Sequence, residues 1–133
     1  MTVSDGDGWK AADLDDLGEG YGFRKIRKGL DVTAFGVNAL VLPPGVWTGR
    51  HFHERQEELY FVHRGTLELE FGDGEEKVRL GPGGMVRVDA ATVRRMGNVG
   101  DEDVVYVIVG GEGGYVGRDG QLPEGEERGA TTR

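Results

Sequence analysis

The sequence of 133 residues contains no cysteine, which excludes both a disulfide framework and a thiolate metal site. It has no apolar run long enough to cross a membrane, and its first residues do not resemble a signal peptide. Ser4 is the only serine, which argues against a hydrolase with a serine nucleophile. Together these absences favour a cytoplasmic protein of one domain that has no membrane partner.

Positive charge is also scarce. There are 16 Lys and Arg residues against 24 Asp and Glu residues, so the formal net charge is -8 at pH 7. Proteins that bind nucleic acid need a dense basic surface, and this balance argues against such a partner. The one basic cluster, residues 24–28, is short and interrupted, and we expect it to be the solvated face of a strand.

Glycine, in contrast, is abundant, with 25 residues. From Tyr21 onwards, short β-type runs alternate with glycine-containing turns at nearly regular spacing. The clearest element is a hairpin, in which residues 66–71 and 77–80 flank a turn at residues 72–74. Further strands are expected over residues 23–27, 32–42, 46–53, 59–63, 85–88, 93–96 and 104–109. The pattern predicts an all-β domain, either an antiparallel barrel or a sandwich.

The composition divides the chain into three parts. Residues 1–20 form an acidic, glycine-rich arm with one helix-like piece over residues 9–17. Residues 21–116 form the β-domain. Residues 117–133 form a charged tail, which we expect to be partly disordered beyond about residue 123.

Two of the three histidines, His51 and His53, are separated by one residue. Side chains two apart on a strand share a face, so both imidazoles point to the same side. With Glu58, at the start of the next strand, they supply the donors of a 2-His-1-carboxylate metal site. By the same period, Glu57 and His63 lie on the face opposite Glu58, outside this site.

The segment 45–65 resembles the first motif of the cupin superfamily. Gly45, His51, His53, Glu58 and Gly65 stand at the spacing of that motif, and the resemblance extends over roughly residues 30–110. It implies a small single-domain cupin, whose fold is an antiparallel β-barrel of the jelly-roll type, also called a double-stranded β-helix.

The second cupin motif is incomplete. It can be laid on Gly83, Asp89, Ala91, Arg94 and Asn98, of which only Gly83 and Asn98 match. In metal-binding cupins the position of Arg94 holds a third histidine. Arginine stays protonated and cannot ligate a cation, so the implied shell is reduced to the two histidines and the glutamate of the first motif.

This departure leaves three hypotheses open. In the first, His51, His53 and Glu58 bind a divalent transition metal (Fe, Mn, Ni, Zn or Cu) on one face of the ion. In the second, Arg94 pairs with Glu58 in a metal-free site, and its guanidinium binds a carboxylate or phosphate. In the third, the histidines are polar residues that line the barrel without a ligand.

The strand period also predicts a pocket. Trp47 shares the strand face of the two histidines, Tyr60 shares the face of Glu58, and Met96 shares the face of Arg94. A cavity lined by Trp47, Tyr60, Arg94 and Met96 would suit a small molecule. For each aromatic residue taken alone, simple core packing is the favoured explanation.

The leading functional hypothesis is a cupin that binds a small anionic or polyhydroxylated metabolite beside a metal. As an enzyme, it would by resemblance catalyse dioxygenase, isomerase or decarboxylase-like chemistry, with Arg94 orienting the substrate and Tyr60 assisting proton transfer. The alternative is a non-catalytic, metal-free cupin that binds or senses a metabolite through an Arg94–Glu58 clamp. We leave open whether the protein is an enzyme. Because small cupins commonly pair through their sheets, we expect a homodimer.

Overall fold

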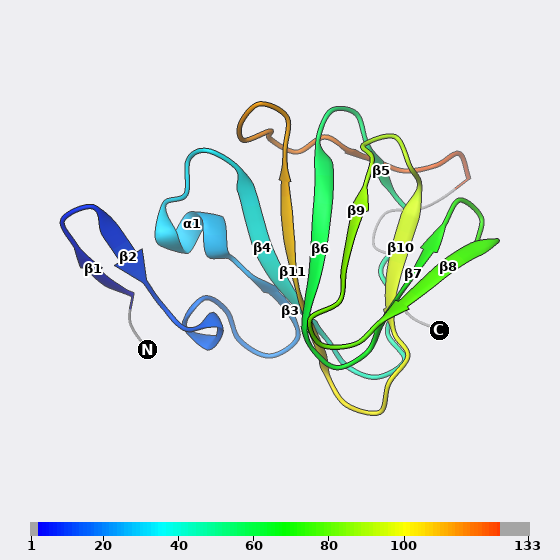
Figure 1. Cartoon of the computed structure of the whole chain (residues 1–133), viewed down its shortest axis with the longest axis horizontal. Coiled ribbons are helices and arrows are strands. Elements are labelled where there is room, and N and C mark those ends of the chain that lie inside the picture. The colour runs from blue at the N-terminus through cyan, green and yellow to red at the C-terminus, as the bar shows by residue number, and fades with distance from the viewer. Residues whose placement is uncertain (1–2, 126–133) are drawn as a thin grey trace.

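A computed structural model describes residues 3–125 of the chain (Figure 1). Most of the tail expected to be disordered, residues 126–133, lies outside the described residues. The described part is built mainly from strands, with one short α-helix and one 3-10 helix. None of its helices is long or apolar enough to cross a membrane.

The larger of two facing sheets has five antiparallel strands in the order β3-β4-β11-β6-β9. Figure 1 shows these strands side by side in the middle of the molecule. Their bounds are Gly22–Arg24 (β3), Gly36–Leu42 (β4), Glu57–Arg64 (β6), Met85–Val88 (β9) and Val104–Gly111 (β11).

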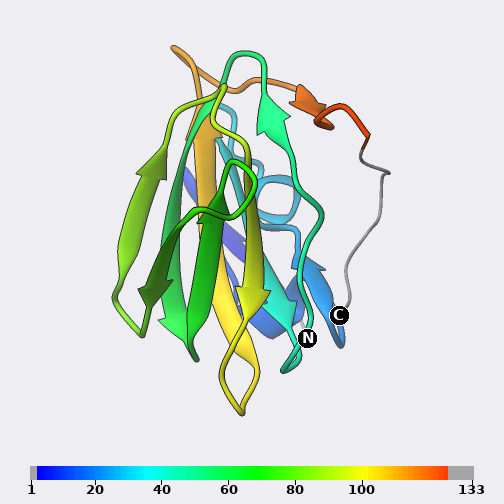
Figure 2. The ribbon, with the colours of Figure 1, turned by 90° about the vertical axis from the view of Figure 1, so that its right-hand side faces the viewer.

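The smaller sheet has the order β10-β7-β8, with bounds Leu67–Phe71 (β7), Glu76–Leu80 (β8) and Arg94–Asn98 (β10). Residues 46–51 extend it beyond β10 through the isolated bridges Trp47↔Gly97 and His51↔Arg94. Figure 2 shows this sheet as a layer in front of the larger one. The prediction of an all-β jelly-roll is therefore confirmed, although the sheets of the described part do not join into one closed barrel.

The core lies between the two sheets and follows from the two-residue period of the strands. In β6 the buried and exposed residues alternate: Glu58, Tyr60 and Val62 point inward, whereas Glu57 and His63 are exposed. The positions predicted for these residues on the strand are confirmed. The buried core cluster comprises Leu40, Leu42, Tyr60, Val62, Leu67, Leu69, Val88, Met96, Val104 and Tyr106.

The segment after β3 differs from the prediction. The expected strand over residues 23–27 ends at Arg24, and the helix α1 (Ile26–Leu30) follows it. Asp31 ends this helix in a left-handed conformation, with φ 54°, so β4 begins only at Gly36. Arg24 is buried and donates hydrogen bonds to Asp15 and to the carbonyl of Gly20. The basic cluster is therefore not the solvated face of a strand.

The N-terminal arm is a hairpin that projects from the body, at the left of Figure 1. Its strands are β1 (Ser4–Gly6) and β2 (Trp9–Ala11), and Gly8 turns the chain between them with a φ of +86°. The prediction of a helix-like piece over residues 9–17 is wrong at its start, because residues 9–11 form β2. Only Leu14–Asp16 form a 3-10 helix. The sequence pattern missed the tight turn that only glycine adopts readily.

The segment after β11 returns to the edge of the smaller sheet. Its strand β12 (Gly120–Gln121) pairs with β5 (Phe52–His53), and Figure 2 shows the two side by side near the top. The part expected to be a separate tail from residue 117 therefore begins with residues that pair with β5. That strand belongs to residues 46–53, which carry His51 and His53 and are called the histidine segment below.

Candidate metal centre

The two histidines lie along the edge of β10, and Glu58 approaches them from the first residues of β6 in the other sheet. His51 is fixed by two backbone hydrogen bonds with Arg94, of 3.0 and 2.9 Å. The donor atoms of His51, His53 and Glu58 all lie within 4.8 Å of one another. The structure therefore brings the predicted trio together at one end of the sandwich.

Both imidazoles are oriented through Nδ1. The Nδ1 of His51 lies 3.2 Å from the carbonyl oxygen of Gly49, and the Nδ1 of His53 lies 2.7 Å from Oδ1 of Asp119. Since both partners accept hydrogen bonds, each Nδ1 carries a proton. A metal-ligating histidine is held in this way by its outer partner.

The Nε2 of His53 is buried and, among the described residues, has no hydrogen-bond partner. It lies 3.2 Å from Oε1 of Glu58, so two acceptors face each other unless a proton or a cation lies between them. Two ligands bound at about 2.1 Å to one ion, at a right angle, stand about 3.0 Å apart. The donor set and this unpartnered nitrogen fit a divalent transition metal.

Oε1 of Glu58 is also held by two hydrogen bonds. It accepts one from the hydroxyl of Tyr60 at 2.6 Å and one from Nη2 of Arg94 at 2.8 Å. Burial alone would raise the pKa of Glu58, but His53, Tyr60 and Arg94 lower it from 4.5 to about 2. The carboxylate therefore stays ionised and able to ligate at neutral pH.

Arg94 has no exposed surface, and its donors are directed at fixed acceptors. Nη1 lies 2.7 Å from the carbonyl oxygen of Thr92 and 3.2 Å from that of Ala90, and Nε donates to the hydroxyl of Tyr60 at 3.2 Å. The ion pair with Glu58 that the metal-free hypothesis requires is present. The guanidinium thus sets a permanent positive charge beside the carboxylate.

The hydroxyl of Tyr60 donates to Glu58 and accepts from Arg94. Burial raises the pKa of Tyr60 well above its ordinary value, so the phenol is neutral. Beside it lies Tyr106, at 6.3 Å between ring centroids, whose buried hydroxyl has no hydrogen-bond partner among the described residues. Tyr106 was missed by the sequence analysis, although its place two residues after Val104 on β11 puts it on the inner face.

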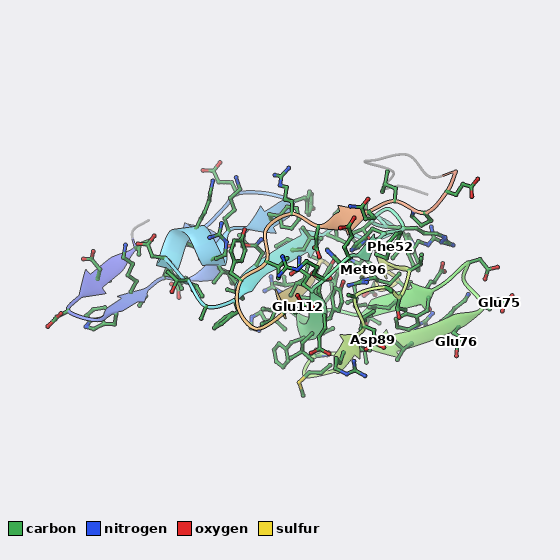
Figure 3. The ribbon with its side chains drawn as sticks, turned by 90° about the horizontal axis from the view of Figure 1, so that it is seen from above. Phe52, Glu75, Glu76, Asp89, Met96 and Glu112 are labelled. Atoms are coloured by element: carbon green, nitrogen blue, oxygen red, sulfur yellow. The ribbon has the colours of Figure 1, made fainter. Side chains whose placement is uncertain are left out.

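The other two residues of the predicted pocket lie on opposite faces of β10. Met96 belongs to the core between the sheets, where Figure 3 labels it. The indole of Trp47 covers Gly97 and stacks on the guanidinium of Arg95 at 4.4 Å, on the other face of the strand. The structure therefore brings Met96 and Tyr60 into one core cluster but not Trp47.

The two histidines differ in their affinity for protons. Burial lowers the pKa of His51. Burial alone would also lower the pKa of His53, but the carboxylates of Glu58 and Asp119 outweigh it, and the pKa is raised. A proton and a metal ion therefore compete for the Nε2 of His53, whereas His51 is neutral and ready to ligate.

No signal in the sequence points to Asp119. This residue lies 66 positions after His53 in the chain and reaches it only because β12 folds back on β5. No motif or period connects two residues so far apart. The contact follows from the tertiary fold alone.

The comparisons with known proteins agree with this fold. A family model described as "Cupin domain" matches residues 39–110, more than half of the chain. No curated protein matches the sequence.

Among solved structures, the chain is similar to an uncharacterised conserved protein with a double-stranded β-helix domain from Klebsiella pneumoniae, at 23% identity and a TM-score of 0.60, covering 68% of this chain and 76% of that one. It is similar to a predicted oxalate decarboxylase from Thermotoga maritima, at 25% identity and a TM-score of 0.52, covering 56% of this chain and 64% of that one. It is also similar to the DMSP lyase DddQ from Ruegeria pomeroyi, at 25% identity and a TM-score of 0.58, covering 70% of this chain and 46% of that one.

Proposed function

The chain belongs to the cupin family, and from this premise we propose that it is a metal-dependent enzyme that acts on a small anionic metabolite. One observation carries the proposal. Both imidazoles are anchored at Nδ1, and the buried, unpartnered Nε2 of His53 faces the carboxylate of Glu58 across 3.2 Å. This is the arrangement of a 2-His-1-carboxylate site, which leaves positions on the ion open to a substrate.

Lewis-acid polarisation of a substrate oxygen is the chemistry that a divalent ion (Fe, Mn, Ni, Zn or Cu) supplies in such a site. The chain's own residues orient the reacting groups. Tyr60 and Arg94 hold Glu58 by two hydrogen bonds, so its carboxylate keeps one orientation. Both of these residues act through a ligand of the proposed metal, so we assign them as positioning residues of the site.

The charges favour an anionic substrate. A divalent ion and Arg94 together carry three positive charges, and Glu58 offsets only one of them inside a largely buried site. The ionised carboxylate of Asp119, which contacts His53, offsets a second, so an incoming carboxylate would restore neutrality. The similarity to a predicted oxalate decarboxylase and to a DMSP lyase supports enzymatic chemistry within this structural family.

Elemental analysis of tag-free protein, purified without chelators, tests the proposal. We expect about one equivalent of a transition metal, lost in His51→Ala and retained in His63→Ala. The second variant is the matched control, because His63 is an exposed histidine on the outer face of β6. A chain that holds no metal even after supplementation would contradict the proposal.

A second candidate is a metal-free cupin that binds a metabolite without catalysis. The 2.8 Å ion pair between Arg94 and Glu58 favours it, because it neutralises the carboxylate without a metal. In that case His51→Ala would change neither the metal content nor the response of the protein to added metal. Binding of a small carboxylate would require Arg94 to release Glu58, because its other donors are held by Tyr60 and by backbone carbonyl groups.

A further inference from the structure

The carboxylate of Asp119 is buried against the histidine segment and accepts four hydrogen bonds. Its Oδ2 accepts from the backbone N–H groups of Arg55 and Gln56, at 2.8 and 3.1 Å. Its Oδ1 accepts from Nε2 of Gln56 at 2.6 Å and lies 2.7 Å from Nδ1 of His53. Only 8% of the residue is exposed.

The two oxygens of Asp119 have different partners and different roles. The backbone donors fix Oδ2, because they belong to the turn between β5 and β6 and cannot rotate away. Oδ1 is then aimed at His53. A carboxylate only accepts hydrogen bonds, and Oδ1 of Asp119 lies closer to His53 than Oε1 of Glu58 does, at 2.7 Å against 3.2 Å, so the proton of the neutral imidazole lies on Nδ1.

We propose that Asp119 is a positioning residue, which fixes the tautomer and the ring orientation of His53 so that Nε2 faces the metal. This inference rests on the proposed metal site. Outer carboxylates of this kind orient metal-ligating histidines, and their loss typically lowers metal affinity by about 10- to 100-fold.

Gln56 and Gly110 support this arrangement. The amide of Gln56 lies over Gly110 of β11, where an added Cβ would be 2.4 Å from Oε1 of Gln56 and 3.3 Å from Cγ of Glu58. The absence of a side chain at Gly110 therefore leaves room for the amide of Gln56, which donates a hydrogen bond to Asp119. Because Glu58 also lies close to Gly110, the same residue of β11 affects the positions of both carboxylates.

Asp119→Asn gives a specific test, since only one of its two orientations satisfies the backbone. The amide oxygen must take the place of Oδ2 to accept from Arg55 and Gln56. The NH₂ group then faces Nδ1 of His53 and the side-chain amide of Gln56, which turns over to present its oxygen. Nδ1 of His53 becomes an acceptor, and the proton moves to Nε2. A protonated Nε2 cannot ligate a metal.

Long-range ¹H–¹⁵N spectra of the metal-free protein, at a pH where the imidazoles are neutral, report the tautomer directly, and the chain has only three histidines to assign. We expect His53 to carry its proton on Nδ1 in the wild type and on Nε2 in Asp119→Asn. Titration with Zn²⁺ should show an affinity lower by about 10- to 100-fold in the variant.

Glu112→Gln is the matched control. It removes a nearby carboxylate that is exposed and pairs only with the side chain of Arg55 among the described residues, so the tautomer and the affinity should not change. A wild-type His53 protonated on Nε2, or the same tautomer in wild type and Asp119→Asn, would overturn the inference. If the wild type binds no Zn²⁺, the proposed function fails, but the spectra of the metal-free protein still decide the role of Asp119.

Discussion

Glu58 is the residue on which the polar groups of the site converge. Its carboxylate receives hydrogen bonds from Tyr60 and Arg94 and lies 3.2 Å from the imidazole of His53. Only 8% of Glu58 is exposed, so these partners replace most of its water. Its ionised form is therefore stabilised by the fold, and the stability of the fold depends on its ionisation.

Glu58→Gln should change how stability depends on pH. The pKa of Glu58 falls from 4.5 to about 2 on folding, so its contribution is complete above pH 4.5 and is lost as the pH falls towards 2. The shift corresponds to roughly 3 kcal/mol. The raised pKa of His53 acts in the opposite sense, since its contribution is present at low pH and is lost as the pH rises through that pKa.

Chemical denaturation at pH 7, 4.5 and 2.5 measures the effect. The wild type should lose free energy of unfolding between pH 4.5 and pH 2.5, and Glu58→Gln should lose less over the same step. Glu57→Gln, which changes an exposed neighbour on the outer face, serves as the control and should follow the wild type. Parallel curves for Glu58→Gln and the wild type would show that Glu58 ionises as in the unfolded chain.

Arg94→His should raise metal affinity, because a third imidazole would replace a fixed positive charge at the start of β10. The metal-free variant should be less stable than the wild type. The carbonyl groups of Ala90 and Thr92 and the hydroxyl of Tyr60 lose a donor, at about 1–3 kcal/mol for each group left unsatisfied.

Titration with Zn²⁺ and thermal unfolding with and without the ion distinguish the two effects. A gain in melting temperature on adding Zn²⁺ that is larger for Arg94→His than for the wild type would support three converging ligands. An unchanged affinity would show that His51, His53 and Glu58 do not share one ion.

At the scale of residues, the sequence predicts the positions that follow from the two-residue period of a strand. It places His51, His53 and Glu58 together and puts Glu57 and His63 on the outer face. It cannot predict Asp119, because the contact depends on how the chain returns after β11. Nor can it place Trp47, because residues 46–51 form only isolated bridges and the period of a regular strand does not hold there.

At the scale of elements, the histidine segment is attached to β10 through Trp47. The indole lies directly over Gly97, where an added Cβ would be 2.1 Å from the ring, and it stacks on the guanidinium of Arg95. Only 3% of Trp47 is exposed. The position of the segment that carries His51 and His53 thus depends on the missing side chain at Gly97.

Gly97→Ala should therefore displace Trp47 and destabilise the protein by about 1–3 kcal/mol, as overpacking does in a filled site. Metal affinity should fall with it, because the histidine segment moves. Gly117→Ala is the control, since an added Cβ there meets nothing within 4 Å. Chemical denaturation of both variants measures the difference, and equal stabilities would contradict the packing argument.

The sequence predicts whole elements well where alternation is regular. The strand expected over residues 85–88 is found as Met85–Val88, and the β7–β8 hairpin is found with its turn. It fails between Lys25 and Phe35, where apolar residues such as Ile26 and Leu30 belong to α1 instead of a strand. Five residues of helix are too few to show a helical period, and this helix is stabilised by packing on β4 and Leu17.

At the scale of the whole molecule, part of the outer face of the larger sheet is apolar and exposed. Leu59 and Phe61 of β6 and Met85 of β9 are 39%, 37% and 59% exposed, and Phe61 pairs with Met85 across the two strands. An exposed patch of this kind is typical of an interaction surface. Within residues 23–42, β4 is paired on both sides and only β3 is an edge of this sheet.

We expect a homodimer that forms through this outer face. Light scattering of the wild type should give twice the monomer mass of 14.5 kDa. Phe61→Asp should reduce it to the monomer mass, whereas Phe23→Asp, a change of an exposed aromatic residue on β3, should not. A monomeric wild type would refute the prediction, and a dimer broken only by Phe23→Asp would move the interface to the β3 edge.

The pairing of β12 with β5 also sets an order of events during synthesis. A ribosome releases His51, His53 and Glu58 long before it adds Asp119, which is 66 residues beyond His53. A nascent chain therefore carries all three ligands while His53 is still free to turn and to exchange its proton between the two nitrogens. The contact of Asp119 with His53 forms only after β11 has been made and the following segment has folded back, so binding of the proposed metal would be a late step in the maturation of this protein.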